Sequence, residues 1–185
     1  MTATGGERVA ALVLAAGAST RFGSPKQVTP WEGQPLVRFV AGEVAAVVPR
    51  VVVVTGAHAA LVREALEGTA VQLVFAEHWA RGPGASVKAG LAALGDVDAV
   101  LITLCDLPHV TRDDYGRLVG ATGGLVAAAF DGAVGAPVVV RAPYLEALAG
   151  LDDASGASQL LRAHRAQVVS VPCPAAALDL DVPVV

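Results

Sequence analysis

The sequence has few charged residues, and positive charges are not in excess. Only 16% of the residues are charged, and the formal net charge is −4. Domains that bind nucleic acid usually present a strongly basic face, so this balance argues against a nucleic-acid partner. It does not argue against a nucleotide substrate, because one local cluster of amides and cations is enough to bind one.

Cysteines and long apolar runs are also scarce. Cys105 and Cys173 are too few for a secreted disulfide scaffold, and neither lies in a CxxC or Cys/His metal pattern. No apolar run approaches the roughly 18 residues that span a membrane. Glu7 and Arg8 interrupt the N-terminus, which therefore does not resemble a signal peptide. We expect a cytoplasmic protein that makes no membrane contact.

Apolar residues make up 54% of the chain, which allows a sizeable core without disulfides. Strand-like and helix-like runs alternate through the first two thirds. We expect strands over residues 9–14, 51–55, 71–75 and 99–104, and helices over 35–47, 59–66 and 85–94. Strands that are apolar throughout are buried on both faces, and their alternation with helices indicates parallel βαβ units. The prediction is an α/β fold of three layers, α/β/α and Rossmann-like.

The last third is less regular. Runs over 125–130 and 137–140 flank the turn Asp131-Gly132 and could form a hairpin, which would add a late antiparallel strand to a mostly parallel sheet. Further expected elements are helices over 143–148 and 158–164, a strand over 168–171 and a short final strand over 177–182. No linker is long enough to separate domains, so residues 1–185 are expected to form a single domain.

The segment LVLAAGASTRFGSPKQ, residues 12–27, carries the strongest functional signal. A buried strand is followed by small residues, hydroxyls and two cations: Gly17, Ser19, Thr20, Arg21, Gly23 and Lys26. Glycines let backbone N–H groups form an anion-binding nest, and Arg and Lys add charge for phosphate oxygens. Neither a Walker loop nor the dinucleotide motif GxGxxG is present. The segment therefore predicts a triphosphate-binding loop of another kind.

The pattern LAAGxSxRFGxxK resembles the signature of the nucleotidyltransferases related to molybdenum cofactor biosynthesis. The resemblance is closest to the molybdenum cofactor cytidylyltransferases, because the guanylyltransferase relatives typically read LAGG where this chain has Ala16. It implies a nucleotidyltransferase fold and a reaction in which CMP passes from CTP to a phosphorylated pterin while pyrophosphate leaves. It also implies Mg²⁺ as cofactor and leaves room for a molybdoenzyme client.

The carboxylates are the candidate metal ligands. Asp106 follows a buried strand and precedes Pro108, and Mg²⁺ prefers one or two carboxylates together with phosphate oxygens and water. The alternative is that Asp106 caps a following helix. Asp179 and Asp181 form a second pair, and the resemblance implies that Asp181 is a further metal ligand; a solvated pair is the alternative. An acceptor phosphate needs no general base, because its second pKa is about 6.

The segment 81–90 resembles the family's G-x-S-x-S-[LV]-[KR]-x-G element, which lies beside the nucleotide base. Gly84 and Ser86 match it, although Ser86 as a simple helix cap is the alternative. Gly56 lies at another strand end and is expected to help form the base pocket, with His58 either beside it or starting a helix. The resemblance implies catalytic roles for Arg21, Lys26 and Asp106. It implies that the nucleotide is bound by Leu14, Ala15, Ala16, Gly17, Ser19, Arg21, Lys26, Gly56, Gly84 and Ser86.

The first two thirds of the chain would thus bind the NTP and the last third the acceptor. Two alternatives stay open. One is the same chemistry with GTP, or with a sugar- or alcohol-phosphate acceptor, and these separate at Ala16 and Ala136; the relatives carry histidine at the second position. The other is a non-catalytic nucleotide-binding or cofactor-chaperone protein. Tight NTP binding without magnesium-dependent pyrophosphate release would favour it.

Overall fold

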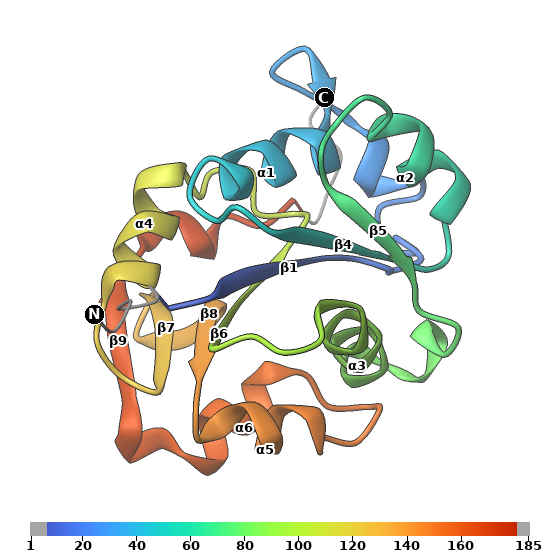
Figure 1. Ribbon diagram of the computed structural model, residues 1–185. Helices are drawn as coiled ribbons and strands as arrows, with labels where there is room; N and C mark the ends of the chain where they lie inside the picture. Colours follow the sequence, from blue (N-terminus) through green and yellow to red (C-terminus); the bar gives the residue numbers. More distant parts are fainter. Residues whose placement is uncertain (1–6, 181–185) are drawn as a thin grey trace, which may run out of the picture.

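The computed structural model describes residues 7–180. A seven-stranded sheet in the order β5-β4-β1-β6-β8-β7-β9 forms its centre (Figure 1). The strands are β1 (Val9–Ala15), β4 (Val51–Thr55), β5 (Gln72–Phe75), β6 (Ala99–Leu104), β7 (Leu125–Phe130), β8 (Ala133–Arg141) and β9 (Val168–Pro172). Only β8 runs against the others, since it pairs antiparallel with β6 and β7 while the remaining pairs are parallel. The predicted α/β class and the late antiparallel strand are confirmed.

Helices cover both faces of this sheet. One face carries α1 (Leu36–Ala45), α2 (Ala59–Ala65) and α4 (Arg112–Gly120), and the other carries α3 (Pro83–Leu94), α5 (Tyr144–Ala149) and α6 (Ala157–Ala163) (Figure 1). The chain moves along the sheet in one direction from β1 to β4 and β5, then returns past β4 and β1 to β6. Because crossovers between parallel strands are right-handed, that return places α3 opposite α1 and α2.

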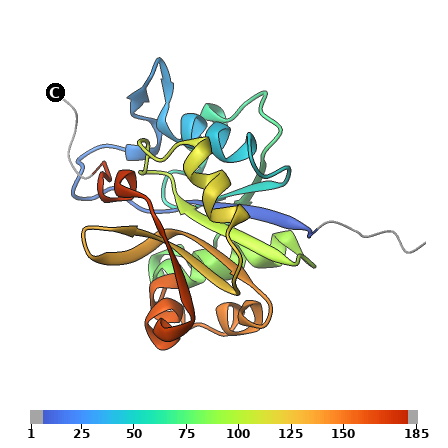
Figure 2. The same cartoon turned by 90° about the vertical axis from the view of Figure 1, so that its left-hand side faces the viewer.

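Shorter elements complete the structure. They are the hairpin of β2 (Pro30–Trp31) and β3 (Gln34–Pro35), and the 3-10 turns η1 (Lys26–Val28), η2 (Trp79–Arg81), η3 (Arg165–Gln167) and η4 (Pro174–Ala177). In the view turned by 90° (Figure 2), β9 is the edge strand that faces the viewer and leads into η4, both in red. No helix in the described part of the chain has the length and apolar character to cross a membrane.

Two separate cores lie against the two faces of the sheet. Ala11 and Val13 of β1 belong to the core under α1, α2 and α4, whereas Ala10 and Leu12 belong to the core under α3, α5 and α6. All four side chains are at most 1% exposed. Successive side chains of a strand point to opposite faces, so an uninterrupted apolar run fills both cores at once.

The hairpin predicted around Asp131-Gly132 is present. Both turn residues have positive φ, 48° and 75°, as a tight two-residue turn between antiparallel strands requires. β8 begins at Ala133, earlier than expected, and its pairing with β7 shifts between Ala127 and Ala128.

Two expectations about elements were wrong. The short final strand expected over 177–182 is replaced by η4 and an irregular stretch through Leu180, and residues 181 and 182 lie outside the described residues. No helix was expected over α4, which nevertheless has a clear start signal. The Thr111 hydroxyl accepts from the Asp114 amide at 3.4 Å, and the Thr111 amide donates to the Asp114 carboxylate at 3.0 Å, which together form a capping box.

Candidate active site

The glycine loop and Asp106 follow neighbouring strands. Leu14 of β1 pairs with Leu104 of β6, and the Cys105 amide donates to the Leu14 carbonyl at 3.1 Å. The chain leaves these two parallel strands in opposite directions along the sheet, one toward β4 and the other toward β7. In open α/β sheets, ligands bind beyond the carboxyl ends of the strands at such a switch point.

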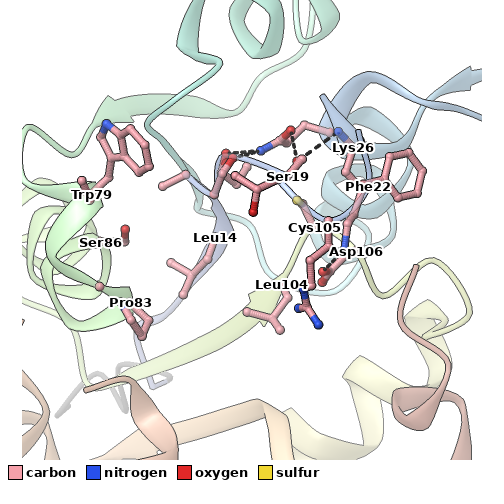
Figure 3. Close-up of a pocket in the computed structure, with 18 residues that line it drawn as sticks. Leu14, Ser19, Phe22, Lys26, Trp79, Pro83, Ser86, Leu104, Cys105 and Asp106 are labelled. Carbon is pink, nitrogen blue, oxygen red and sulfur yellow. Dashed lines mark hydrogen bonds and ion pairs between the residues drawn. The ribbon is translucent and has the colours of Figure 1, made fainter. Parts of the chain in front are cut away.

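A pocket of about 430 Å³ opens there. Figure 3 shows the loop, Lys26 and Asp106 on one side of it, with Trp79, Pro83 and Ser86 on the other. The lining residues are Leu14, Ala15, Ala16, Gly17, Ser19, Thr20, Arg21, Phe22, Lys26, Gln27, Trp79, Ala80, Gly82, Pro83, Ser86, Leu104, Cys105 and Asp106. Most of the residues expected to bind nucleotide therefore border one cavity, whereas Gly56 and Gly84 do not line it.

Lys26 and Asp106 form an ion pair at this pocket, as the close-up shows (Figure 3). The ammonium Nζ lies 3.0 Å from Asp106 Oδ2, and the two side chains are only 12% and 22% exposed. The same ammonium lies 5.8 Å from the centre of the Phe22 ring. Partial burial keeps the attraction between these two charges from being fully screened by water.

Asp106 does not cap the next helix. That helix, α4, begins at Arg112 and has Thr111 as its N-cap. The second carboxylate oxygen of Asp106, Oδ1, is buried and accepts no hydrogen bond from any described residue. A buried carboxylate oxygen without a donor is costly, and a cation is a fitting partner for it.

Gln27 organises the inside of the glycine loop. Its side chain is 2% exposed, and its amide Nε2 donates to the carbonyls of Ala15 (3.1 Å) and Gly17 (2.7 Å). The Ser19 hydroxyl donates to Gln27 Oε1 at 3.2 Å and accepts from the Lys26 amide at 3.1 Å. Sequence reasoning passed over Gln27. The feature of the sequence that could have indicated its role is the position of this polar residue directly after Lys26.

The opposite wall is the start of α3. Its N-cap is Gly82 and its first residue is Pro83, so Ser86 lies inside the helix, is 4% exposed and does not cap it. Free amides at a helix start attract anions, and this start borders the pocket. The helix-cap alternative for Ser86 is thus wrong, while its role in binding stays a prediction.

Gly84 faces the chain's own backbone rather than the pocket. A Cβ there would lie 2.0 Å from the Asp152 carbonyl oxygen and 2.3 Å from that of Ser155. The Ala85 amide donates to the Asp153 carbonyl at 3.2 Å. The close approach that glycine permits here is therefore between the start of α3 and the segment 152–155.

The Asp153 side chain completes this contact. It accepts from Lys88 at 2.9 Å and from Arg81 at 3.2 Å. These hydrogen bonds, from Lys88 first and Arg81 second, lower the pKa of the Asp153 carboxyl below its usual range. The segment from the last third of the chain is thereby tied to the pocket wall.

Gly56 supports the pocket from behind. A Cβ at Gly56 would lie 2.5 Å from the Ala16 carbonyl oxygen and 2.7 Å from Cγ of Trp79. Because glycine has no Cβ, Trp79 and Ala16 can come close to the end of β4. His58 is the N-cap residue of α2 without a side-chain capping bond, and its Nε2 lies 3.1 Å from the Ala18 carbonyl oxygen.

Two other side chains have no part in this chemistry. Cys105 lines the pocket but is 6% exposed, and burial, followed by the charge of Asp106, raises the pKa of its thiol. A thiol is a nucleophile only as its thiolate, so Cys105 serves as a small buried residue. Phe75, the last residue of β5, is 51% exposed and does not line the pocket.

Any metal bound here would need ligands beyond the described side chains. Within residues 7–180 no group of three or more His, Cys, Asp or Glu side chains is placed to hold an ion. Asp181 lies outside the described residues, but the Leu180 amide donates to the Asp106 carbonyl at 2.9 Å. Asp179 is exposed. The buried oxygen Oδ1 of Asp106 fits a divalent cation whose remaining ligands come from substrate phosphates and water.

Known proteins are similar to this chain in sequence. A "Bifunctional protein GlmU" from Koribacter versatilis is 34% identical over 119 residues, 62% of this chain and 25% of that protein. A "Probable molybdenum cofactor guanylyltransferase" from Bacillus cereus is 28% identical over 115 residues, 62% of this chain and 57% of that protein. The matches thus span between a quarter and just over half of these relatives.

Solved structures agree over nearly the whole chain. The homologue of Mycobacterium tuberculosis rv0371c from Mycobacterium sp. strain JC1 is 26% identical with a TM-score of 0.79, and covers 95% of this chain and 91% of that one. Rv0371C from Mycobacterium tuberculosis H37Rv, solved as a complex with manganese, is 24% identical with a TM-score of 0.72, and covers 90% of this chain and 88% of that one.

A family model completes the comparison. The model described as the MobA-like NTP transferase domain matches residues 11–168, which include the glycine loop, Asp106 and both walls of the pocket. The chain therefore belongs to the MobA-like NTP transferase domain family.

Proposed function

We propose that this protein is a nucleotidyltransferase that transfers CMP from CTP to a phosphorylated pterin of the molybdenum cofactor type, with Mg²⁺ as cofactor and release of pyrophosphate. The observation that carries the proposal is the Lys26–Asp106 ion pair at 3.0 Å, which puts a cation and a candidate metal ligand at one end of the glycine loop. A triphosphate needs both, because its own charge must be neutralised while it reacts.

The triphosphate would lie along the loop. Backbone amides would donate to phosphate oxygens, and Arg21 and Lys26 would add positive charge. The base would point toward Ala16 and Ser86, which border the same pocket. This arrangement uses the lining residues for binding and leaves the mouth of the pocket to the acceptor.

Asp106, with Asp181 as the further candidate, would hold the divalent cation. When bound, the ion neutralises charge on the phosphate oxygens. The manganese bound in Rv0371C supports a divalent cation in this family, and magnesium is the choice proposed for this chain.

The chemistry is a single displacement at phosphorus. An oxygen of the acceptor phosphate attacks the α-phosphorus and forms a new P–O bond. The bond from that phosphorus to the bridging oxygen breaks, and pyrophosphate leaves with the electron pair. The acceptor phosphate is largely dianionic at neutral pH, since its second pKa is about 6. No side chain has to remove a proton, and Lys26 and Arg21 act by holding charge.

The acceptor side falls to the last third of residues 1–185, which we treat as one domain with the nucleotide-binding part. β8 runs against β6, with Val138 opposite Ile102, so Gly135 and Ala136 lie toward the carboxyl end of β6. That is the end that carries Asp106. The hairpin therefore reaches the edge of the sheet at which the acceptor has to arrive.

The decisive experiment measures pyrophosphate release from each of the four NTPs, with Mg²⁺ and a phosphorylated pterin acceptor. We expect turnover to be fastest with CTP. Turnover with none of the four, by a folded protein, would contradict the proposal. Tight NTP binding without pyrophosphate release would point instead to a nucleotide-binding or cofactor-chaperone protein.

The second candidate is the same reaction with GTP. The Bacillus cereus relative favours this candidate, because it is named as a probable molybdenum cofactor guanylyltransferase. The base preference depends on Ala16, which lines the pocket and is 6% exposed. The two candidate reactions follow the same chemistry, and the contact between the base and Ala16 is what would decide between them.

An Ala16→Gly variant tests this dependence. We expect the ratio of kcat/KM for CTP to that for GTP to fall by roughly tenfold, because about 1.4 kcal/mol of discrimination is typical of one methyl-sized contact. Competition between the two nucleotides in one reaction measures the ratio. An unchanged ratio would remove Ala16 from base selection, and a wild-type preference for GTP would decide for the guanylyltransferase.

A further inference from the structure

The carbonyl groups of residues 15–19, in the first half of the glycine loop, are all bonded to the protein itself. Gln27 Nε2 donates to the carbonyls of Ala15 at 3.1 Å and Gly17 at 2.7 Å. The Ala57 amide, just before α2, donates to the Ala16 carbonyl at 3.1 Å. Three successive carbonyls are thus held by Gln27, at the end of the loop, and by the segment just before α2.

The next two carbonyls follow the same rule. His58 Nε2 lies 3.1 Å from the Ala18 carbonyl oxygen. The Ser19 carbonyl accepts from the amides of Phe22 at 3.1 Å and Gly23 at 3.2 Å. From Ala15 to Ser19, therefore, each carbonyl oxygen is occupied before any ligand is present.

The orientation of the amides follows from peptide geometry. In a planar trans peptide the C=O and the following N–H point in opposite directions. Where a carbonyl is turned into the protein, the next N–H is turned away from it. The amides of Gly17, Ala18 and Thr20 donate to no acceptor among residues 7–180. Such a run of outward amides is an anion-binding nest, and inward carbonyls keep acceptor oxygens away from the anion.

We infer that Gln27 and His58 are positioning residues that hold the glycine loop in its phosphate-binding conformation before the nucleotide arrives. The inference rests on the proposed binding of a triphosphate at this loop. Neither side chain needs to touch the nucleotide. Each acts through the backbone, and holding the loop in advance strengthens binding because less freedom is lost when the ligand arrives.

The two side chains suit this role in different ways. Gln27 is buried, and its single amide group serves two carbonyls and the Ser19 hydroxyl. His58 is partly exposed at the start of α2. A carbonyl oxygen can only accept, so Nε2 of His58 carries the hydrogen in this contact. One residue thus fixes the loop from within and the other from the neighbouring helix.

The test measures the affinity of the full chain for inorganic tripolyphosphate by calorimetry, which probes the loop without base, acceptor or catalysis. We expect Gln27→Met to weaken binding by about 10- to 100-fold, because two loop carbonyls lose their donor. His58→Leu should weaken it by about 3- to 30-fold, whereas His58→Gln, which keeps a donor at similar reach, should stay within about threefold of wild type.

Two controls separate positioning from general damage. Gln72→Met makes the same substitution at an exposed position of β5, and Leu118→Ala destabilises the protein from α4 without touching the loop. Both should bind tripolyphosphate like wild type, and Leu118→Ala should nevertheless lower the melting temperature. A loss of affinity in Leu118→Ala equal to that in Gln27→Met would overturn the inference.

The remaining outcomes are distinct. Wild type that binds neither tripolyphosphate nor any NTP would contradict the proposed function itself. Wild type that binds, with Gln27→Met equally tight, would overturn the inference and leave the function intact. If Gln27→Met does not fold, the His58 pair decides: weakening in the Leu variant with recovery in the Gln variant supports positioning, and equal affinities in both contradict it.

Discussion

Lys26 and Asp106 are 80 residues apart in the sequence, and their side chains meet at 3.0 Å. Each has a separate reason to be where it is. Lys26 ends the glycine loop, and Asp106 follows the strand next to the one that precedes the loop. Their meeting gives the pocket opposite charges at one end, which is what a metal-bound triphosphate requires.

Removing either charge should reduce turnover while leaving the fold intact. We expect Lys26→Met and Asp106→Asn each to lower kcat by about 100-fold or more, since preorganised charges at a reacting phosphate contribute at least that much. Pyrophosphate release at saturating NTP and Mg²⁺ gives the rate. The exposed positions Arg63→Met and Asp113→Asn serve as matched controls. Wild-type rates in the first pair would take both residues out of the mechanism.

Among single residues, the sequence predicted the charged side chains of the site better than the side chains that position the loop. Lys26 and Asp106 could be predicted because their residue types and their places after strands indicate phosphate and metal binding. Gln27 and His58 could not, because their importance lies in which carbonyls they reach, and that depends on how η1 and α2 pack beside the loop. Gly84 was predicted to bind the nucleotide, and the group that lies closest to it in the structure is the backbone of residues 152–155.

Among the elements, α3 connects the two parts of the chain. Its first turn borders the nucleotide pocket through Pro83 and Ser86, while the segment 152–155 packs against Gly84 from the other side. The position of the pocket wall therefore depends on residues from the last third of the sequence. Two changes at this contact test that dependence.

Gly84→Ala should destabilise the protein. The new Cβ would lie 2.0 Å from a backbone oxygen of Asp152, which cannot rotate away as a flexible side chain could. We expect a loss of about 1–3 kcal/mol in the free energy of unfolding, measured by urea denaturation. Gly116→Ala in α4 is the matched control, because nothing lies within 4 Å of its Cβ position; there a gain of about 0.5–1 kcal/mol is expected from helix propensity. Equal effects at the two glycines would contradict this account.

Asp153 should make the same contact dependent on pH. Its hydrogen bonds from Lys88 and Arg81 lower its pKa in the folded protein. Its contribution to stability is therefore complete above the unfolded-state pKa of about 3.9 and is lost as the pH falls through the lower folded value. Urea denaturation should show Asp153→Asn to be less stable than wild type at pH 7, with a smaller difference at pH 3. A difference that does not change with pH would mean that the charge of Asp153 is not involved.

Elements buried on both faces were the most predictable. β4, β6 and β7 have the expected bounds, because an apolar run between turn residues leaves few alternatives. α4 was missed because its sequence, RDDYGRLVG, is polar on most sides and is held by Tyr115 and Leu118 alone in the core. The final strand was wrong because alternation of Asp and apolar residues in ALDLD mimics a strand, whereas Leu180 simply packs beside Asp106.

For the molecule as a whole, ligand binding should appear as added stability. A ligand that binds only the native state, at 100 times its Kd, adds about 2.7 kcal/mol. For a protein of this size that corresponds to a rise of about 5–11 °C in Tm. We expect this rise with CTP and Mg²⁺ in a thermal-shift measurement, and a smaller one after chelation by EDTA.

The Asp106→Asn variant gives the control for the metal. It should keep a shift with CTP alone and lose the additional shift on adding Mg²⁺. No shift with any nucleotide would contradict binding at the loop. A full shift in Asp106→Asn with Mg²⁺ would place the metal elsewhere.

The position of β1 between β4 and β6 also bears on how the protein folds. Leu14 pairs with Val54 and Leu104, partners 40 and 90 residues away, so the pocket has no short-range precursor. Closing such long loops is slow, and folding rates fall as contacting residues become more distant in the chain. A nascent chain that has not yet produced β6 has the glycine loop but no opposing carboxylate. Nucleotide and metal can therefore bind together in the pocket only after β1 and β6 have paired at the centre of the sheet.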